Sequence, residues 1–477
     1  MDAIAFGFIS YLFLILFVGL YTVRKTKNLQ DYALGGHKLG PIVIAFSERA
    51  SGESAWLILG LPGAAMLFGM LEIWTVIGCL SGIILSWILL AYPLRKEVEK
   101  YNVLTLPEYF EKKYDDRMGI IRIISSLIIT FFFTFYIAAQ FSGAGKVLNI
   151  TFGFTQFNGM VIATIIIIFY TLLGGFTAVA FTDLVQGIIM FCTLVILPIV
   201  GFFEISTNNM SEIINWGTLY GGETSKNASI VASIGGLSWG LGYLGQPHLI
   251  ARYMAIDKPE HIKISRKIAF AWAIPAFFGA MFTGLIGKVL VDSGVLLLNG
   301  NIINSINDIP DPEKIMPILA NNLLPNWLAG IFISGAIAAM MSTADSQLLV
   351  STTILTKDIV NRYLFKSLSD SKLLVFSRIF TILIGVIAFY MAMKSEKLVL
   401  EMVSYAWGGL GSSFGPVIVL TLWWTKIRKE GVVAGLISGT FFTIYPMYNS
   451  LITPRVSAFV LSMISIIIIS KFKDYLD

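Results

Sequence analysis

The chain of 477 residues is 56% hydrophobic and 13% charged, and its formal net charge is +5. Soluble domains carry roughly a quarter charged residues, so this composition excludes a water-soluble globular protein. The apolar residues stand in blocks of about twenty, the length that crosses a hydrocarbon layer roughly 30 Å thick. We therefore expect a single all-α integral membrane domain over residues 1–477, with the lipid bilayer as its surroundings and no nucleic-acid partner.

The first apolar block, Ala3–Val23, is interpreted as a spanning helix and not as a signal peptide. A signal peptide carries its positive charge ahead of the apolar stretch. Here Met1 and Asp2 precede the block, and Arg24 and Lys25 follow it. This order of charges predicts a first span with the N-terminus outside.

Thirteen candidate spans follow one another along the chain. They cover approximately residues 3–23, 41–67, 71–92, 120–147, 157–177, 183–203, 229–252, 266–290, 326–353, 373–393, 398–424, 431–450 and 453–471. With the N-terminus outside, the cytoplasmic loops hold 26 of the 34 Lys and Arg residues, and the external loops hold seven. Positive charge accumulates on the cytoplasmic side of membrane proteins. We expect a multi-pass protein of the inner (plasma) membrane of the cell, with its C-terminus in the cytoplasm.

Two external connections, residues 204–228 and 292–325, are longer than simple turns. Both are expected to contain short helices at the membrane surface. Neither connection is assigned a specific role from its sequence.

Two spans are interrupted near their middle by small, polar and helix-breaking residues. The second span reads Ala-Ser-Gly-Glu-Ser-Ala-Trp over residues 50–56, and the seventh holds five glycines and a proline between residues 235 and 247. Transporters expose backbone polar groups at mid-membrane through such interruptions. Because the two breaks lie five spans apart, we expect two inverted five-helix repeats, over about residues 41–203 and 229–424.

The ninth span presents oxygen-bearing groups on one face. Ala339, Ser342, Thr343 and Ser346 are offset by 0, 3, 4 and 7 residues, so they share one side of a helix. Hydroxyls and a neighbouring carbonyl suit Na⁺, because hard cations take oxygen ligands. Alternatively, the hydroxyls bond to carbonyls one turn back, as Ser and Thr often do in membrane helices. Free carbonyls at the first break would complete a cation site, which favours the first interpretation.

Charged residues inside spans are functional candidates, because burying a charge in a bilayer is costly. Asp183 begins the sixth span and is either a helix cap facing the cytosol or a cation ligand. Glu48, Arg49 and Glu53 lie at the first break, where Arg49 and Glu53 pair if the helix persists between them. These three residues either form a structural charge network or take part in ion coupling.

Four aromatic residues lie well inside their spans and away from the membrane interface, where Trp and Tyr usually gather. They are Trp56, Tyr136, Trp239 and Tyr243. Buried aromatic side chains with polar atoms can enclose a small amphipathic solute. We therefore expect a solute pocket between the two breaks.

Six motifs carry a resemblance to a known family. They are Asp-Tyr-Ala-Leu-Gly-Gly at residues 31–36, Leu-Gly-Leu-Pro-Gly-Ala at 59–64, Leu-Thr-Leu-Pro-Glu-Tyr-Phe at 104–110, Tyr-Thr-Leu-Leu-Gly-Gly-Phe at 170–176, Trp-Gly-Leu-Gly-Tyr-Leu-Gly-Gln-Pro-His at 239–248 and Val-Ser-Tyr-Ala-Trp at 403–407. On these motifs the chain resembles, nearly end to end, the sodium:solute symporter family, and it looks most like the bacterial sodium/proline symporters. The resemblance implies a leucine-transporter-type fold, with one helix ahead of two inverted repeats and two helices after them.

The resemblance also implies roles for particular residues. The Na⁺ site of the family uses a set of backbone and hydroxyl oxygens that match Ala50, Glu53, Ala339, Ser342 and Thr343. The pocket of proline transporters is lined by residues that match Ser54, Trp56, Gly60, Tyr136, Trp239, Tyr243 and Pro247. The resemblance thus implies Na⁺ as the coupling ion, no further cofactor, proline as the solute, and no obligate protein partner.

One position departs from the family pattern. Sodium/proline symporters carry an aspartate important for Na⁺ at the position that matches Gly52. Glu53 is the next residue, and Asp345 stands at the edge of the hydroxyl face where those transporters have a serine. Either one of these carboxylates restores the negative charge, or one takes up a proton and the coupling ion is H⁺. Asp183, Asp345 and Ser346 are accordingly additional candidate cation ligands.

We therefore expect a cation-coupled secondary symporter that imports proline by alternating access, with Na⁺ as the first choice of cation. The same pattern also fits a symporter of this family for another small organic solute. A membrane-embedded enzyme is not expected, because the chain contains no His-Glu-x-x-His motif or comparable nucleophile and base.

Overall fold

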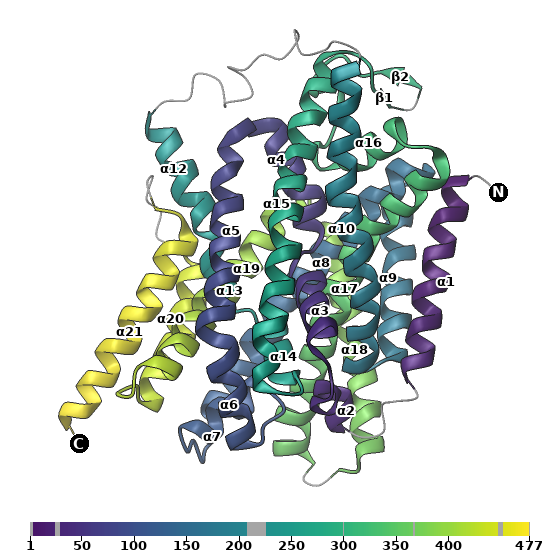
Figure 1. Ribbon diagram of the computed structural model, residues 1–477. Helices are drawn as coiled ribbons and strands as arrows, with labels where there is room; N and C mark the ends of the chain where they lie inside the picture. The colour runs from purple at the N-terminus through teal and green to yellow at the C-terminus, as the bar shows by residue number, and fades with distance from the viewer. Residues whose placement is uncertain are drawn as a thin grey trace.

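The computed structural model describes residues 3–23, 29–207, 226–298, 300–365, 368–446 and 452–476. Almost all of these residues are helical, and the helices form one bundle (Figure 1). Within the described chain the only sheet is a hairpin of β1 (Leu297–Leu298) and β2 (Asn301–Ile302). The expected all-α fold is confirmed.

Helices of the first half precede and include the first expected repeat. They are α1 (Ala3–Val23), α2 (Leu29–Leu34), α3 (Pro41–Gly52), α4 (Leu61–Phe68), α5 (Ile73–Ser86), α6 (Tyr92–Tyr101), α7 (Leu106–Lys113), α8 (Ile120–Phe152), α9 (Gln156–Leu173) and α10 (Phe176–Thr207), with the short turns η1 (Gly35–His37), η2 (Trp56–Gly60), η3 (Gly69–Glu72) and η4 (Trp87–Ala91). Proline at the first position begins α3, because its fixed φ angle is already helical and its missing N–H would have no partner there.

Helices of the second half include the second expected repeat and the last two spans. They are α12 (Lys226–Leu237), α13 (Trp239–Tyr243), α14 (Pro247–Ala255), α15 (Ile262–Asp292), α16 (Ile315–Leu323), α17 (Asn326–Ile354), α18 (Asp370–Lys394), α19 (Val399–Trp423), α20 (Lys429–Ile444) and α21 (Pro454–Leu476), with η6 (Pro259–His261), η7 (Ile306–Asp308), η8 (Pro312–Lys314) and η9 (Leu355–Leu364).

Nine helical segments of the described chain are long and apolar enough to cross a membrane. The other four expected spans, near residues 41–67, 157–177, 229–252 and 431–450, are occupied by helices that are broken or shorter. Polar residues explain the two broken ones, because they disrupt the apolar run that length and hydropathy detect. The total of thirteen spans agrees with this arrangement and stays a prediction.

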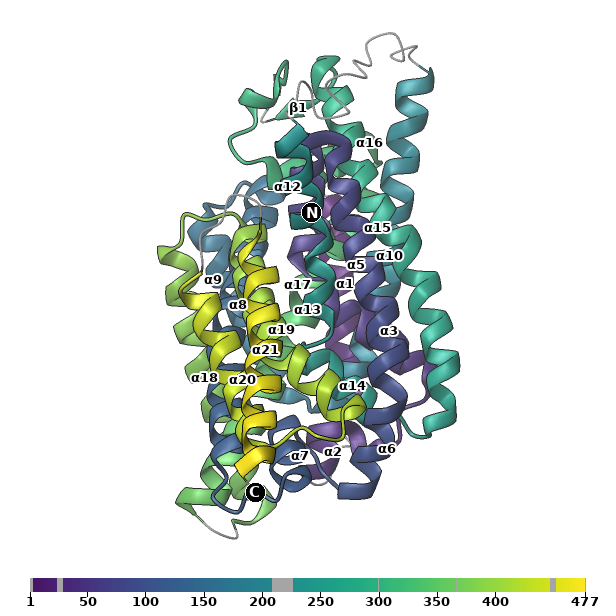
Figure 2. The ribbon, with the colours of Figure 1, turned by 90° about the vertical axis from the view of Figure 1, so that its left-hand side faces the viewer.

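The centre of the bundle is α17, which is buried along nearly its whole length. It packs on α1, α3, α8 and α10. The last two helices, α20 and α21, lie side by side on the flank opposite α1 (Figures 1 and 2). Polar side chains on α17 therefore face other helices and not lipid.

The connection over residues 292–325 contains the hairpin, two short turns and α16, so the short helices expected there are confirmed. The other long connection, residues 204–228, falls for the most part outside the described residues. In both views α1 begins at the upper end of the bundle and α21 ends at the lower end (Figures 1 and 2). The start of α1 and the end of α21 thus lie at opposite ends of the bundle.

Candidate functional site

The second span is interrupted at residues 53–55. The helix α3 ends at Gly52, Glu53 takes φ −103° and ψ 83°, and the chain resumes in η2. Gln140 of α8 satisfies one of the freed amides, because its Oε1 accepts a hydrogen bond from the backbone N of Ala55 at 3.0 Å. The predicted break is confirmed. Gln140 was not predicted, although a polar amide within an apolar span was a usable signal.

The seventh span is interrupted at residues 244–246. The helix α13 ends at Tyr243, Gln246 is extended with φ −84° and ψ 108°, and α14 begins at Pro247. A Cβ at Gly245 would lie 2.7 Å from the carbonyl oxygen of Leu410, so only glycine lets α19 approach this closely. The second predicted break is confirmed as well.

Oxygen atoms of α3 and α17 converge beside the first break. The Ser342 Oγ lies 2.9 Å from the carbonyl oxygen of Ala50. It also lies 2.8 Å from the carbonyl oxygen of Ala338 and 3.2 Å from that of Ala339. A single hydroxyl hydrogen cannot satisfy three carbonyl oxygens. Four oxygen atoms of the two helices therefore lie close together, which is the kind of environment that a hard cation prefers.

The neighbouring hydroxyl extends the same contact surface. The Thr343 Oγ1 donates to the carbonyl oxygen of Ser51 at 3.0 Å. Two of the three hydroxyls on the predicted α17 face thus contact backbone oxygens of α3. The Ser342 hydroxyl also lies within bonding distance of the Ala338 carbonyl one turn back in α17. The bond within the helix and the contact with α3 are therefore both present.

Three charged residues at the break form a cluster that is completely buried. Arg49 Nη1 donates to Glu53 Oε1 at 2.8 Å, and two further guanidinium nitrogens bond to the Glu48 carboxylate. The predicted pair of Arg49 and Glu53 is confirmed. Tyr243 joins the two broken helices, because its hydroxyl donates to Glu53 Oε1 at 3.0 Å. With both carboxylates ionised, the cluster has a formal net charge of −1.

A second buried cluster surrounds Asp183. This residue is the eighth of α10 and fully buried, so the interpretation as a cap facing the cytosol is wrong. Its Oδ2 accepts from Ser47 at 2.6 Å, from Ser51 at 3.0 Å and from the Arg252 guanidinium at 3.1 Å. The same guanidinium nitrogen donates to the Ser346 Oγ at 2.5 Å. Arg252 therefore holds α3, α10 and α17 together.

The 26 Lys and Arg residues assigned to the cytoplasmic loops include Arg252, and for this residue the assignment is wrong. It lies in α14 and is fully buried. The distribution of positive charge identifies which end of a span faces the cytoplasm, but it cannot detect a side chain that turns inward. Only the tertiary structure, in which the guanidinium reaches Asp183 of α10, shows that it meets a buried carboxylate.

Asp345 lies beside this second cluster and not at the first break. It is fully buried, its Oδ1 lies 3.3 Å from the Ser346 Oγ, and the charge of Asp183 acts on it. Its Oδ2 has no hydrogen-bond partner among the described residues. Of the two carboxylates expected to compensate for Gly52, Glu53 therefore lies at the break and Asp345 lies farther along α17.

Aromatic side chains fill the space between the two breaks. The Trp56 and Trp239 rings stack with centroids 5.0 Å apart, and the Tyr136 hydroxyl lies 3.3 Å from the Ser54 Oγ. Trp407 of α19 completes the cluster, because its ring packs edge-on against Tyr243 at 4.6 Å and its Nε1 donates to the Trp239 carbonyl at 3.0 Å. Trp407 was not predicted as a site residue, although it belongs to the motif at residues 403–407.

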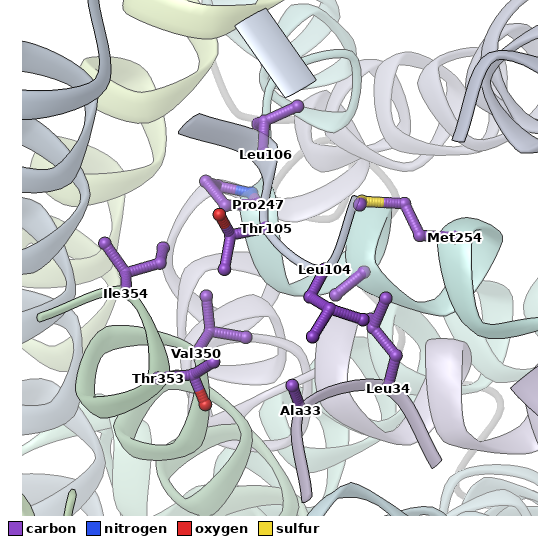
Figure 3. A pocket seen from close by; sticks show the side chains of 11 residues that line it. Ala33, Leu34, Leu104, Thr105, Leu106, Pro247, Met254, Val350, Thr353 and Ile354 are labelled. Carbon is purple, nitrogen blue, oxygen red and sulfur yellow. The ribbon is translucent and has the colours of Figure 1, made fainter. Parts of the chain in front are cut away.

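The remaining two candidates for the solute pocket lie apart from this cluster. Gly60 packs against Leu400 of α19. Pro247 lines a small cavity together with Leu104, Thr105 and residues of α2, α14 and α17, whose side chains point toward a common space (Figure 3). The structure therefore brings five of the seven candidates together around the aromatic cluster.

Comparisons with known proteins agree with this arrangement. The sequence profile of the Sodium:solute symporter family matches residues 32–439. The high-affinity proline transporter PutP of Bacillus subtilis (strain 168) is 36% identical over 97% of this chain and 99% of its own length. The sodium/proline symporter of Escherichia coli (strain K12) is 36% identical over 92% of this chain and 86% of its own length.

Solved structures show the same fold at low sequence identity. A Na⁺-coupled sialic acid symporter in a substrate-bound outward-open state is 20% identical, with a TM-score of 0.78 over 99% of this chain and 98% of its own. MhsT in complex with L-phenylalanine is 14% identical, with a TM-score of 0.54 over 91% of this chain and 97% of its own. The expected leucine-transporter-type fold is confirmed. The chain belongs to the sodium:solute symporter family, and it is a membrane transporter and not an enzyme.

Proposed function

We propose that this chain is a Na⁺-coupled symporter that imports proline by alternating access. The observation that carries the proposal is the meeting of two surfaces at the first break. Backbone and hydroxyl oxygens of Ala50 and Ser342 converge on one side of it, and the stacked rings of Trp56 and Trp239 lie on the other. Relatives named as proline transporters align with nearly the whole chain, which supports proline as the solute.

The coupling Na⁺ is assigned to backbone oxygens and hydroxyls of α3 and α17. Its ligands are Ala50, Glu53, Ala339, Ser342 and Thr343. The contacts of Ser342 and Thr343 with α3 support this set, because a cation between the same oxygens would join the two helices. A bound ion shifts the balance between outward-facing and inward-facing states only through its different affinity for them. A site divided between two helices provides that difference.

The buried cluster of Glu48, Arg49 and Glu53 supplies the negative charge that Gly52 lacks. A Cβ at Gly52 would lie 3.2 Å from the Leu249 Cδ2 and 3.9 Å from the Arg49 Nη2, so a side chain there would lie next to the same guanidinium. The cluster thus stands where the carboxylate of other family members would project. With both carboxylates ionised, its net charge of −1 acts over a short distance in a medium of low dielectric constant, where it attracts a cation.

The solute pocket is assigned to residues at the two breaks and on α8. They are Ser54, Trp56, Gly60, Tyr136, Trp239, Tyr243 and Pro247. Proline offers an apolar ring that packs on aromatic faces and an ammonium group that aromatic rings attract. Gly60 and Pro247 are included on the family resemblance, whereas direct contacts support the other five.

A second cation site near α10 is a separate proposal. Its candidate ligands are Asp183, Asp345 and Ser346. The guanidinium of Arg252 already joins Asp183 and Ser346. A cation at this place therefore competes with Arg252 for the same oxygens.

The proposed topology has one domain over residues 1–477 with repeats over about 41–203 and 229–424. The N-terminus lies outside and the C-terminus lies in the cytoplasm. The distribution of Lys and Arg supports this orientation, and the beginning of α1 and the end of α21 lie at opposite ends of the bundle (Figure 1).

An alternative is proline transport coupled to H⁺. It is favoured by one observation, the buried Asp345 Oδ2 without a hydrogen-bond partner among the described residues. A buried carboxylate that lacks partners is costly to keep ionised. A second alternative is another small organic solute, since the aromatic cluster also fits other apolar rings.

Uptake into proteoliposomes tests these alternatives. Labelled proline is offered under an inward Na⁺ gradient and under an inward H⁺ gradient, at matched membrane potential. Accumulation driven by Na⁺ alone supports the proposal, and accumulation driven by H⁺ alone transfers the coupling role to a carboxylate. Folded protein that accumulates no proline under either gradient rules out proline as the solute.

A further inference from the structure

A buried glutamine contacts each of the two breaks. Gln140 Nε2 donates to the Tyr136 carbonyl at 3.3 Å, and Gln246 Nε2 donates to the Gly242 carbonyl at 3.1 Å. In both cases the accepting carbonyl lies four residues back along the chain, and neither glutamine side chain is exposed to solvent. The two amide groups therefore have comparable surroundings, and the partners of their oxygen atoms can be compared directly.

The amide oxygens of these two glutamines differ in their partners. Gln140 Oε1 accepts from the backbone N of Ala55 at 3.0 Å, so the oxygen and the nitrogen of that amide are both used. Gln246 Oε1 has no hydrogen-bond partner among the described residues. Leaving a buried acceptor without a donor is unfavourable, because the group has lost its bonds to water. The second break therefore contains a hydrogen-bond acceptor that this part of the chain leaves unused.

A second contact fixes the orientation of the Gln246 amide. Its Nε2 also donates to the Trp407 carbonyl at 3.1 Å, so the nitrogen faces the carbonyl oxygens of both Gly242 and Trp407. A carbonyl oxygen can only accept a hydrogen bond, and an amide nitrogen supplies the two donors that this pair requires. The amide does not turn over, because its oxygen would then face both carbonyl oxygens. Gln246 Oε1 is therefore held in one position.

The groups that hold this amide belong to the aromatic cluster or adjoin it. Gly242 directly precedes Tyr243, and the ring of Trp407 packs edge-on against Tyr243 with centroids 4.6 Å apart. Gln246 itself directly precedes Pro247, the first residue of α14. The segment that joins two candidates for the solute pocket, Tyr243 and Pro247, thus carries the unused acceptor.

We propose that Gln246 Oε1 accepts a hydrogen bond from the ammonium group of the solute and makes the pocket selective for solutes with N–H donors. The identity of that solute as proline rests on the function proposed above. Hydrogen bonds that involve a charged group are roughly twice as strong as neutral ones, and the protonated ring nitrogen of proline is such a donor. A site that bonds a solute N–H rejects an analogue without it, because the buried acceptor is then left unpaired.

A pair of solutes tests this role in the full-length protein. L-Proline and N,N-dimethyl-L-proline share the ring, the carboxylate and the positive charge, but only proline has N–H donors. Their dissociation constants are measured by titration calorimetry in detergent at saturating Na⁺, for the wild type, Gln246→Met and Gln140→Met. Gln246→Met should lower the preference for proline over N,N-dimethylproline by about ten-fold or more. Gln140→Met is the matched control and should leave the preference unchanged, because Gln140 Oε1 already bonds the backbone of Ala55.

The change in preference separates solute binding from a structural role. Gln246 also stabilises the second break through its nitrogen, and loss of that contribution weakens both solutes by the same factor. An unchanged preference in Gln246→Met therefore overturns the proposal, and so does an equal loss of preference in Gln140→Met. Gln246→Glu keeps an oxygen acceptor and should retain the preference for proline. If Gln246→Met does not fold, Gln246→Glu decides alone, since a ten-fold lower preference in that variant also overturns the proposal.

Failure of this role and failure of the proposed function have different signatures. Proline uptake by the wild type, with an unchanged preference in Gln246→Met, overturns only the role of Gln246. A wild type that neither binds nor accumulates proline overturns the proposed function, and pyrrolidine and N,N-dimethylpyrrolidinium then replace the two solutes. A preference for pyrrolidine that depends on Gln246 supports the acceptor, and a preference that does not depend on it overturns the acceptor as well.

Discussion

Replacing Arg49 with Gln tests the buried charge cluster at the first break. Arg49, Glu48 and Glu53 are all without solvent exposure, and the pair of Arg49 and Glu53 measures 2.8 Å. The substitution leaves two carboxylates buried without a counter-charge. Breaking a buried ion pair from one side costs about 3–5 kcal/mol. We expect Arg49→Gln to destabilise the fold by an amount of that order.

Arg117→Gln is the matched control for the same chemical change at the surface. Arg117 pairs with Asp115 at 3.3 Å, and their side chains are 88% and 80% exposed. Exposed pairs contribute about 0–1 kcal/mol. Denaturant unfolding in detergent, monitored for both variants, should therefore show a much larger loss for Arg49→Gln.

A double variant isolates the interaction itself. Adding Glu53→Gln to Arg49→Gln removes one of the two unpaired carboxylates. The double variant should be more stable than the sum of the two single losses by about 0.5–3 kcal/mol. The reasoning is refuted if the two losses add, or if Arg49→Gln costs no more than Arg117→Gln.

Three further outcomes are expected. Ser342→Ala should raise the Na⁺ concentration for half-maximal proline uptake by about ten-fold, because a hydroxyl ligand is lost; an unchanged Na⁺ dependence argues against the site. Gly52→Asp should lower that concentration, since it adds a carboxylate next to Arg49; the same uptake assay would contradict this by showing no shift. Burial tends to raise the pKa of Glu108, but the charge of Lys357, together with hydrogen bonds from Lys357 and the backbone of Leu104, outweighs it and holds the pKa below its ordinary value of 4.5. The pair of Glu108 and Lys357 therefore stabilises the fold above that pH and loses its contribution as the pH falls. The midpoint of denaturant unfolding should thus drop less between about pH 7 and about pH 4 in Glu108→Gln than in the wild type. An equal drop in both proteins would count against the prediction.

The membrane class and most span positions could be predicted because hydropathy is a property of consecutive residues. Nine segments of the described chain, from Ala3–Thr22 to Pro454–Lys473, are long and apolar enough to cross a membrane. Both breaks were also local features, since glycine, proline and small polar residues stand together at residues 50–56 and 235–247. Local composition thus located the places where the helices end.

Only some of the residues that contact the two breaks could be predicted from the sequence. The offsets of Ser342 and Thr343 placed both hydroxyls on one face, and the structure shows that this face meets α3. The pair of Arg49 and Glu53 was likewise four residues apart on one helix. Contacts within one helix follow from its period, and the choice of the facing helix does not.

Contacts between distant helices explain the residues that were missed or misassigned. Arg252 lies near the end of its span by sequence, yet it bonds Asp183, which is 69 positions away along the chain. Trp407 bonds the carbonyl of Trp239 across 168 positions. Gln140 bonds the backbone of Ala55 across 85 positions. No periodicity within one segment contains information about such separations.

By itself the sequence determined that this protein spans a membrane, where its helices break, and which oxygen-bearing residues share the face of its ninth span. These properties depend on transfer free energy and helical period, which act on neighbouring residues. Only the tertiary structure decided that Arg252 neutralises Asp183, that Trp407 completes the aromatic cluster, and that Gln246 holds an acceptor at the second break without a partner in the described residues. Buried polar groups take the partners that packing brings to them, and packing in a bundle joins residues far apart in the chain.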